Sequence, residues 1–375
     1  MSWIGDEIRY DCLYYRGEKP CVFNVPCVYC AHYHPMGLRV LIIKLGAMGD
    51  VLRTTSLLPS LRQFAEKREK NLFTTWIVDP PSRPLLEHNP YIHRLWTVDL
   101  ETVIRLQTER FDLALCLDKE PRAIGLMASC QAADKRGFKM GVEGNLHPAN
   151  PEAEEMLWMG LSDLYKFRRN TKSYQQLIHE AVDLRSAGEL YVLKFTDEEI
   201  AAAREHLARL GALKRPLIGL NTGAGNVFPG KRWSADKFAE LGRRLRDATS
   251  GTIALLGGPE EIERNARLRV ELGPRAVDLG VDNSLRHFAA MVAQFDLLVT
   301  GDTMALHVAL ASGVDTVALF GPTPWREVDL GGRGELLYRE PFGPGIMSQV
   351  DEESSSIQEI TVDEVEAACR RRLAG

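Results

Sequence analysis

The pattern of hydrophobic positions predicts two successive series of strands that alternate with helices. Short and almost continuous apolar runs are typical of strands buried on both faces of a parallel sheet. Such runs cover residues 39–45, 72–78, 95–98 and 111–117 in the first series, and residues 217–220, 252–256, 297–300 and 316–320 in the second. Helical patterns between them cover residues 50–63, 234–247, 259–272, 284–294 and 304–312. This alternation predicts an α/β protein with two doubly wound sheets.

Two further helices are marked by their capping signals. Residues 196–199 and 361–364 both read Thr-x-x-Glu, the spacing of a capping box. We expect the first of these helices to end near Gly211, and the second, at the C-terminal end, near Leu373. The residues Lys-Arg-Pro at 214–216 then form a linker between the two series.

The length and these boundaries predict three parts. A chain of 375 residues is long enough for two domains. We expect a short Cys-rich head at residues 1–37, a first Rossmann-like domain at 38–213 and a second Rossmann-like domain, with a C-terminal helix, at 214–375. A ligand is expected at the carboxyl ends of the strands, in the cleft that the two domains face.

Composition narrows the class of protein. Hydrophobic residues are 45% and charged residues 26% of the chain, so there is enough apolar surface to form a core. No apolar run has the length of a membrane span, and the first twenty residues lack the apolar region of a signal peptide. We therefore expect a cytoplasmic protein. The net charge of −5 disfavours nucleic acid as its partner.

Several common catalytic motifs are absent from the sequence. No strand is followed by Gly-x-Gly-x-x-Gly, and neither a Walker A motif nor a Gly-x-Ser-x-Gly elbow occurs. The sequence also lacks Asp-x-Asp, the acidic pair that commonly holds a divalent metal on a nucleotide-sugar diphosphate. We therefore expect catalysis without a metal or another cofactor.

The first candidate site follows the first strand, where the chain reads KLGAMGD at residues 44–50. The glycines allow a tight turn at the carboxyl edge of the sheet, and Asp50 then begins a helix. A carboxylate at this place can act as a general base. The alternative is that Asp50 only caps the helix.

Two more candidate loops follow strands of the second series. Residues 221–225 (NTGAG) are small enough for a ligand to approach the backbone, and Lys231 or Arg232 can neutralise phosphate. Residues 301–307 (GDTMALH) begin a helix whose N-terminus is suited to an anion. The loop at 320–324 can close over a base or a ribose. The alternatives are a solvated loop, an ordinary helix cap and a core histidine.

In this order the segments resemble the glycosyltransferase family 9 proteins, the lipopolysaccharide heptosyltransferases, which have the GT-B fold. The resemblance covers about residues 39–327. RVLIIKLGAMGDVLRTTSLLPSL is similar to the family's opening strand, Gly-Asp turn and helix, and NTGAGNVFPGKRWSADKFAEL to its phosphate loop. LLGGPEEIERNARL is similar to the ribose-binding segment, and GDTMALHVALASGVDTVALFGPT to the family's most recognisable signature. The resemblance implies an acceptor-side first domain and a second domain that binds the nucleotide sugar.

The resemblance also implies roles for single residues. Asp50 matches the catalytic base, and Lys231 matches the lysine that binds the donor's phosphates and stabilises the leaving nucleotide. Glu261 matches the ribose-binding acid, with Glu260 as the neighbouring alternative. The full set implied to bind the donor is Thr222, Gly223, Lys231, Glu261, Asp302, Thr303, Met304 and His307.

The sequence departs from the family at several of these positions. Met304 and Ala305 stand where many members have Gly and Leu, which changes the fit of the donor. Gly46-Ala47 replaces a pair of serines, and Arg53 replaces a common histidine. Arg53, like Gly49, is implied to lie on the acceptor side, so these changes bear on the acceptor's identity.

The activity implied by the resemblance is inverting sugar transfer. A heptose would pass from a nucleoside-diphosphate donor, ADP-heptose, to a lipopolysaccharide-core or related glycan acceptor. The alternatives are a nucleotide-sugar epimerase with the same fold and a non-catalytic protein that binds nucleotide or sugar. A lipid-linked acceptor would bring the protein to the inner face of the membrane. The basic residues Arg62, Lys67, Arg68 and Lys70 would then face anionic lipid, or otherwise only solvent.

The head, which the resemblance does not cover, holds a candidate metal site. Cys12, Cys21, Cys27 and Cys30 lie within nineteen residues, and Cys27-x-x-Cys30 is a spacing that places two thiolates on one metal. We expect a structural zinc, because so short a segment cannot stabilise itself by burial alone. An iron–sulfur cluster is the main alternative, and four unrelated thiols, or disulfides formed after purification, are the other.

Overall fold

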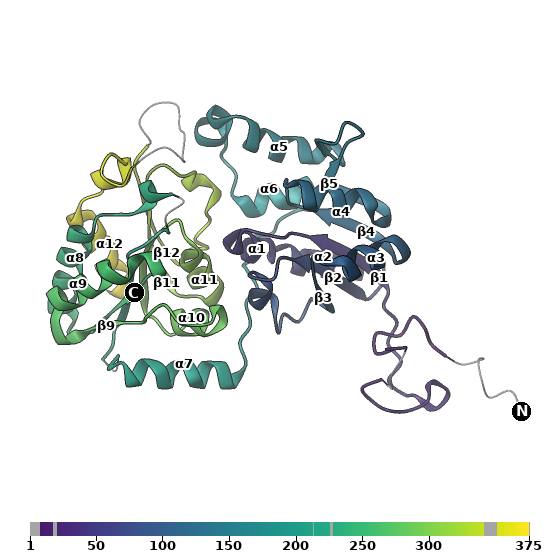
Figure 1. Cartoon of the computed structure of the whole chain (residues 1–375), viewed down its shortest axis with the longest axis horizontal. Coiled ribbons are helices and arrows are strands. Elements are labelled where there is room, and N and C mark those ends of the chain that lie inside the picture. Colours follow the sequence, from purple (N-terminus) through teal and green to yellow (C-terminus); the bar gives the residue numbers. More distant parts are fainter. Residues whose placement is uncertain (1–7, 18–20, 213, 226–227, 341–350, 375) are drawn as a thin grey trace, which may run out of the picture. The chain divides into compact units, whose positions relative to one another are not determined.

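The computed structural model describes residues 8–17, 21–212, 214–225, 228–340 and 351–374 (Figure 1). Residues 1–7 and 18–20 of the predicted head lie outside them. Contacts between residues divide the chain into two compact units. The first comprises Met1–Leu45, Leu58–Asp79 and Pro90–Pro151, and the second comprises Gly46–Leu57, Pro80–Asn89 and Glu152–Gly375.

The first unit contains a sheet with the strand order β3-β2-β1-β4-β5-β6. Its strands are β1 (Leu38–Ile43), β2 (Leu72–Val78), β3 (Arg94–Thr97), β4 (Arg110–Cys116), β5 (Gln131–Met140) and β6 (Leu146–Pro148). The pairs from β3 to β5 are parallel, and β6 pairs with β5 in the antiparallel direction. The strand order changes direction at β1, because β2 and β3 lie on one side of it and β4 to β6 on the other, as in Rossmann-like sheets. The loop after β1 therefore begins at a place where such sheets bind ligands.

Helices cover this sheet. They are α2 (Leu57–Glu66), α3 (Leu100–Thr108) and α4 (Pro121–Ser129). Asp99 caps α3, because its side chain accepts a hydrogen bond of 2.8 Å from the backbone N–H of Thr102. Helices α3 and α4 pack against each other and against β5. At the switch point, Asp118 Oδ2 accepts from the backbone N–H of Leu45 at 2.9 Å and pairs with the buried Lys44 at 3.3 Å.

The second unit contains a fully parallel sheet with the order β12-β11-β10-β7-β8-β9. Its strands are β7 (Leu217–Asn221), β8 (Thr252–Leu256), β9 (Ala276–Asp278), β10 (Leu297–Gly301), β11 (Asp315–Phe320) and β12 (Gly334–Tyr338). Counted from β7, this is again the order 3-2-1-4-5-6. The switch point lies between β7 and β10, so the loops that follow these two strands share one edge of the sheet.

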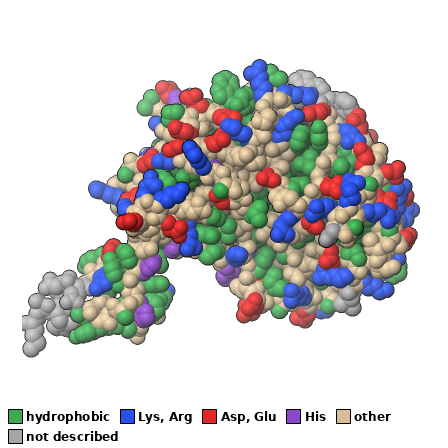
Figure 2. All heavy atoms as spheres, turned by 180° about the vertical axis from the view of Figure 1, so that it is seen from behind, with side chains coloured by type: hydrophobic (Ala, Val, Ile, Leu, Met, Phe, Trp, Pro, Cys, Tyr) green, Lys and Arg blue, Asp and Glu red, His purple; other side chains and the backbone are tan. Residues whose placement is uncertain are grey.

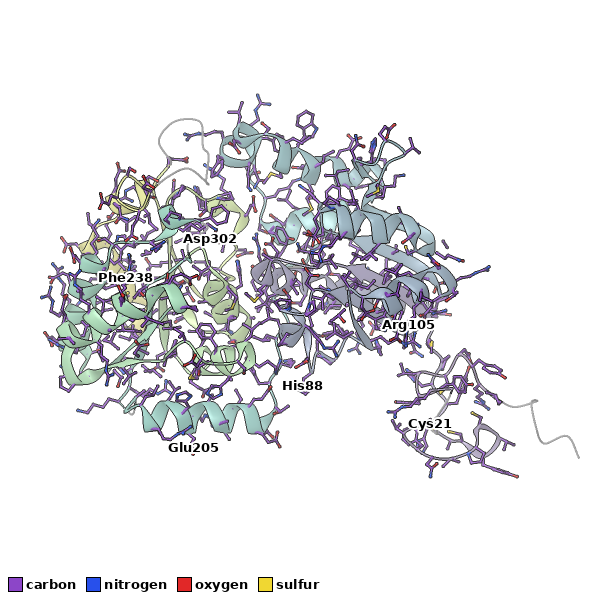
Figure 3. All side chains as sticks on the ribbon, viewed as in Figure 1. Cys21, His88, Arg105, Glu205, Phe238 and Asp302 are labelled. Atoms are coloured by element: carbon purple, nitrogen blue, oxygen red, sulfur yellow. The ribbon has the colours of Figure 1, made fainter. Side chains whose placement is uncertain are left out.

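The helices of the second unit form layers on both faces of its sheet (Figure 1). Helices α8 (Ala235–Thr249), α9 (Ile262–Leu272) and α12 (Val362–Ala374) share one hydrophobic core with the sheet. Helices α7 (Asp197–Arg209), α10 (Leu285–Val292) and α11 (Met304–Ser312) share the other. Leu255 belongs to the first core and its neighbours Ala254 and Leu256 to the second, because successive side chains of a strand point to opposite faces. Phe238, labelled in Figure 3, is fully buried in the first core.

These two sheets confirm the predicted α/β fold. Both capping boxes are confirmed as well: Glu199 and Glu364 accept from the backbone N–H groups of Thr196 and Thr361 at 2.9 and 2.8 Å. No helix among the described residues has the length and hydropathy to span a bilayer.

The helix predicted over residues 50–63 is instead two helices, α1 (Met48–Thr54) and α2. Two hydroxyl groups end α1, because Thr55 Oγ1 donates to the carbonyl of Leu52 at 2.6 Å and Ser56 Oγ to that of Arg53 at 2.9 Å. Pro59 follows, and it lacks the N–H that a continuous helix would need. The break separates α1, which belongs to the second unit, from most of α2, which belongs to the first.

Candidate functional site

A pocket of about 550 Å³ lies at the carboxyl ends of β7, β8 and β10 in the second unit. All of its lining residues belong to that unit. They are Met48, Pro81, Asn221, Gly223, Ala224, Gly225, Phe228, Lys231, Gly257, Gly258, Pro259, Glu260, Glu261, Gly280, Val281, Asn283, Leu285, Phe288, Asp302, Thr303, Met304 and Ala305. The predicted donor residues Gly223, Lys231, Glu261, Asp302, Thr303 and Met304 are among them.

One end of the pocket contains an ion pair and the N-terminus of a helix. Lys231 Nζ lies 3.0 Å from Asp302 Oδ2 and 5.0 Å from the centre of the Phe228 ring. Asp302, labelled in Figure 3, directly follows β10. Burial works to raise the pKa of Asp302, but Lys231, His307 and Arg53 together lower that pKa. Helix α11 begins two residues later with unbonded N–H groups in its first turn, so this end is suited to an anionic ligand.

Asn221 organises the same end, although the sequence marked it only as part of a small-residue loop. Its Nδ2 donates to Thr300 Oγ1 at 2.9 Å and to Thr303 Oγ1 at 3.0 Å. The two threonine hydroxyls are 3.2 Å apart. This network links Thr303, the residue before α11, to Asn221 at the end of β7. It therefore holds this end of the pocket in place.

Glu261 also lines the pocket. Its side chain is buried, and Oε2 accepts from the backbone N–H of Gly258 at 2.8 Å. The other oxygen, Oε1, is buried without a hydrogen-bond partner among the described residues. A buried acceptor of this kind is costly unless a donor reaches it, and ligand hydroxyl groups are suitable donors. Gly223 lies directly against it, because a Cβ there would be 2.1 Å from Glu261 Cδ.

The remaining wall is apolar and was not predicted. Val281, Leu285 and Phe288 line it, with Asn283 beside them. Their sequence segment, between β9 and α10, reads as an ordinary loop and an amphipathic helix, so no motif singles it out. A flat apolar ligand group flanked by one amide fits this wall.

Two predicted donor residues lie outside the pocket lining. Thr222 Oγ1 donates to Asn265 Oδ1 at 2.5 Å and to the carbonyl of Leu256 at 3.2 Å, so this hydroxyl holds α9 to the sheet. His307 is buried in α11, where a Cβ at Gly49 would be 2.6 Å from its Cδ2. Burial and the nearby Arg53 lower the pKa of His307 to about 4, so its ring is neutral at neutral pH.

The predicted base lies in the first turn of α1. The N-cap of this helix is Ala47, so the alternative that Asp50 is its N-cap is wrong. The Asp50 side chain is 40% exposed, and its Oδ1 lies 3.3 Å from Arg53 Nη1. Gly49 brings the backbone of α1 against His307 of α11. Because α1 and α11 pack together, Asp50 is held beside the helix whose N-terminus lines the pocket.

The predicted metal site of the head is not assembled. All four cysteines are described, and each is a free thiol. Within the described ranges, no group of three or more His, Cys, Asp and Glu side chains is placed to hold a metal. The local turns explain part of this. The backbone N–H of Cys30 bonds to the carbonyl of Cys27 at 3.1 Å in a local turn, and Cys12 is buried in a bridge to Pro35.

Comparisons with known proteins give the family that the chain resembles. Residues 162–332 match the family model "Glycosyltransferase family 9 (heptosyltransferase)". The chain is 26% identical over 317 residues to lipooligosaccharide heptosyltransferase 2 of Haemophilus influenzae, covering 76% of this chain and 84% of that protein. It is 32% identical to lipopolysaccharide heptosyltransferase 2 of Escherichia coli over 114 residues, which cover 29% of this chain and 32% of that protein.

Solved structures extend the likeness to the fold. A family 9 glycosyltransferase from Veillonella parvula superposes with a TM-score of 0.68 at 20% identity, covering 90% of this chain and 97% of that one. The ADP-heptose lps heptosyltransferase II of Escherichia coli gives a TM-score of 0.66 at 19% identity, with 90% and 99% covered. Both sheets are thus those of the GT-B fold. The match over residues 162–332 and these relatives show that the chain is similar to the family 9 glycosyltransferases of the heptosyltransferase type.

Proposed function

We propose that this protein transfers a heptose, with inversion, from ADP-heptose to a glycan of the lipopolysaccharide core. The names of the relatives support heptose transfer as the reaction class. The observation that carries the proposal is the pocket itself, whose lining contains a lysine, a helix N-terminus and Glu261, whose buried Oε1 has no hydrogen-bond partner among the described residues. These are the groups that a sugar diphosphate and a ribose require.

The donor fits the pocket in one direction. The diphosphate would lie at Lys231 and the N-terminus of α11, where the positive end of the helix adds to the lysine charge. The ribose hydroxyls would donate to Glu261 Oε1. The base would lie against Val281, Leu285 and Phe288. We assign residues 214–375 to this donor side and residues 38–213 to the acceptor side.

The proposed reaction needs a base, Asp50, and a diphosphate leaving group. Asp50 would accept the proton of an acceptor hydroxyl as its oxygen attacks the anomeric carbon. The bond between that carbon and the diphosphate oxygen breaks on the opposite face, which inverts the configuration. The negative charge that develops on the diphosphate is stabilised by Lys231 and α11.

A stepwise assay tests the proposed function. A thermal-shift screen of nucleoside diphosphates comes first, and we expect ADP to raise the melting temperature most. Labelled ADP-heptose is then incubated with and without a heptose-deficient core acceptor. Turnover without acceptor would point to an epimerase, and ADP binding without turnover would point to a binding protein. The relatives favour neither alternative.

Replacing the lysine should weaken both binding and catalysis. Lys231→Ala removes a charge-assisted hydrogen bond to phosphate, which is worth about 1.5–3 kcal/mol, so we expect ADP affinity and kcat each to fall about 10- to 100-fold. Calorimetry and initial rates measure the two effects. Lys194→Ala, at an exposed lysine of the same unit, is the control. Unchanged affinity in Lys231→Ala would remove this lysine from the site.

A lipid-linked acceptor would place the protein at the inner membrane face, and we propose peripheral contact there through the end of α2. Lys67, Arg68 and Lys70 are exposed, and Arg62 pairs with Glu66 at 2.8 Å. Each basic side chain near an anionic surface contributes about 1 kcal/mol. We expect sedimentation with anionic but not neutral vesicles, and its loss in the triple variant Lys67→Glu, Arg68→Glu, Lys70→Glu. Equal binding by both proteins would contradict this contact.

A further inference from the structure

Arg53 is the unusual residue beside the candidate base. It lies one helical turn after Asp50, its side chain is only 8% exposed, and Nη1 is 3.3 Å from Asp50 Oδ1. The guanidinium carbon lies 3.8 Å from the centre of the Tyr174 ring, which belongs to α6 (Tyr174–Ala181). Arginine is rarely buried unless it is paired. Arg53 is enclosed beside Asp50, whose side chain is 40% exposed. Further contacts must therefore stabilise the buried charge of Arg53.

A second carboxylate holds Arg53 from the other side. Arg53 Nη2 donates to the backbone carbonyl of Glu327 at 3.0 Å and lies 3.7 Å from Glu327 Oε2. Glu327 belongs to the short helix η8 (Trp325–Glu327), which follows β11, and its side chain is 13% exposed. Lys166 lies 4.0 Å from its other oxygen. All these residues belong to the second unit, so the row Asp50–Arg53–Glu327 joins α1 to the loop after β11.

The geometry of the row constrains one atom of the base. Arg53 is fixed by a backbone carbonyl, a carboxylate and an aromatic face, and these contacts leave its planar head little freedom. Its Nη1 therefore approaches Asp50 Oδ1 from a set direction. A carboxylate held in this way presents itself to a substrate in one orientation, and misplacement of a catalytic group by about 1 Å can cost about 100-fold in rate.

We propose that Arg53, anchored by Glu327, is a positioning residue that orients the Asp50 carboxylate toward the acceptor hydroxyl. This inference rests on the proposed function, because it assigns Asp50 the role of base. It accounts for the burial of an arginine beside the candidate base. It also gives Glu327 a role, although no sequence motif marked that residue.

A double-mutant cycle tests the proposal. Arg53→Met keeps an unbranched side chain but removes the guanidinium group and its charge, and we expect kcat to fall about 10- to 100-fold while the donor KM stays within about threefold. Arg53→Lys retains the charge and should recover part of the rate. In the Asp50→Asn background, Arg53→Met should change the remaining rate by less than about threefold, because residues that act as a unit are not additive.

The controls separate the possible failures. Arg243→Met, at an exposed arginine of α8, controls for loss of an arginine, and melting temperatures of all variants report on structure. An equal effect of Arg53→Met in both backgrounds would overturn the proposal, because Arg53 would then not act through Asp50. If Asp50→Asn alone keeps the full rate, the proposed base fails instead. If Arg53→Met does not fold, the same cycle is run with Arg53→Lys and with Glu327→Gln. Each of these changes should then lower the rate more in the wild-type background than in the Asp50→Asn background.

Discussion

Asp50→Asn is expected to lower the rate of sugar transfer about 10²- to 10⁴-fold, which is the usual contribution of a general base. The amide keeps the size of the side chain but cannot accept the proton of the acceptor hydroxyl. Asp50 is absent from the lining of the donor pocket. We therefore expect ADP to bind within about threefold of the wild-type affinity, as for a residue that acts only in the chemical step. Single-turnover transfer and calorimetry measure these two quantities.

A capping aspartate elsewhere in the chain provides the matched control. Asp99 is the N-cap of α3 and bonds to the backbone N–H of Thr102. Asp99→Asn should leave the rate unchanged and alter stability only slightly, because asparagine is also a good N-cap. If Asp50→Asn behaves like Asp99→Asn, then Asp50 serves only the first turn of its helix and the proposed mechanism is wrong.

Arg286→Met is expected to lower the free energy of unfolding by about 2–3 kcal/mol, because it removes the ion-pair partner of Glu199 and the donor to three backbone carbonyls, those of Pro84, Glu87 and Lys194. Arg286 lies at the start of α10 with its side chain 10% exposed, and its fork binds both oxygens of Glu199. It also donates to the carbonyls of Pro84 and Lys194 at 2.8 and 2.7 Å. Chemical denaturation measures the loss. Arg204→Met, at an exposed arginine of α7, should stay within about 0.5 kcal/mol.

The same pair predicts a dependence of stability on pH. Hydrogen bonding from Arg286 lowers the pKa of Glu199 from 4.5 to about 2. Since the folded-state pKa is the lower one, the pair stabilises the protein fully above about pH 4.5 and loses this contribution as the pH falls through 2. In Glu199→Gln the corresponding slope in that range should be smaller. An unchanged slope would show that other carboxylates dominate the acid unfolding.

The sequence predicted those strands that are buried on both faces. β2 and β8 have the predicted bounds, and β1 and β10 differ by one or two residues at an end. β5 was missed, because it reads QAADKRGFKM and much of it is exposed. β9 was missed because three residues are too short for a periodic signal. The pattern of hydrophobic positions thus reveals the central strands of each sheet apart from β5, and of the four edge strands it marked only β3.

The residues of the candidate site also divide into those that the sequence could predict and those that it could not. Gly223, Lys231 and Asp302 could be found because a turn or a charge stands directly after a strand. Phe288 and Leu285 could not, because an apolar residue that lines a pocket looks the same in sequence as one in a core. A charged residue in a helix predicts an exposed face, and therefore the burial of Arg53 was also beyond the pattern. The cysteine spacing gave a possible metal site, but spacing alone does not bring four sulfur atoms together.

Under the proposed function, the ion pair between Lys231 and Asp302 affects both the binding and the dissociation of the nucleotide. Since the lysine already has a resident counter-ion at 3.0 Å, an incoming diphosphate exchanges one anion for another and does not meet a bare cation. The net gain on binding is then the difference between two attractive interactions, which is smaller than either one. When the product nucleotide dissociates, Asp302 pairs with Lys231 again, and this pairing favours dissociation. Under the proposed function, Asp302 would therefore limit how long the product stays bound, which would favour turnover over tight binding.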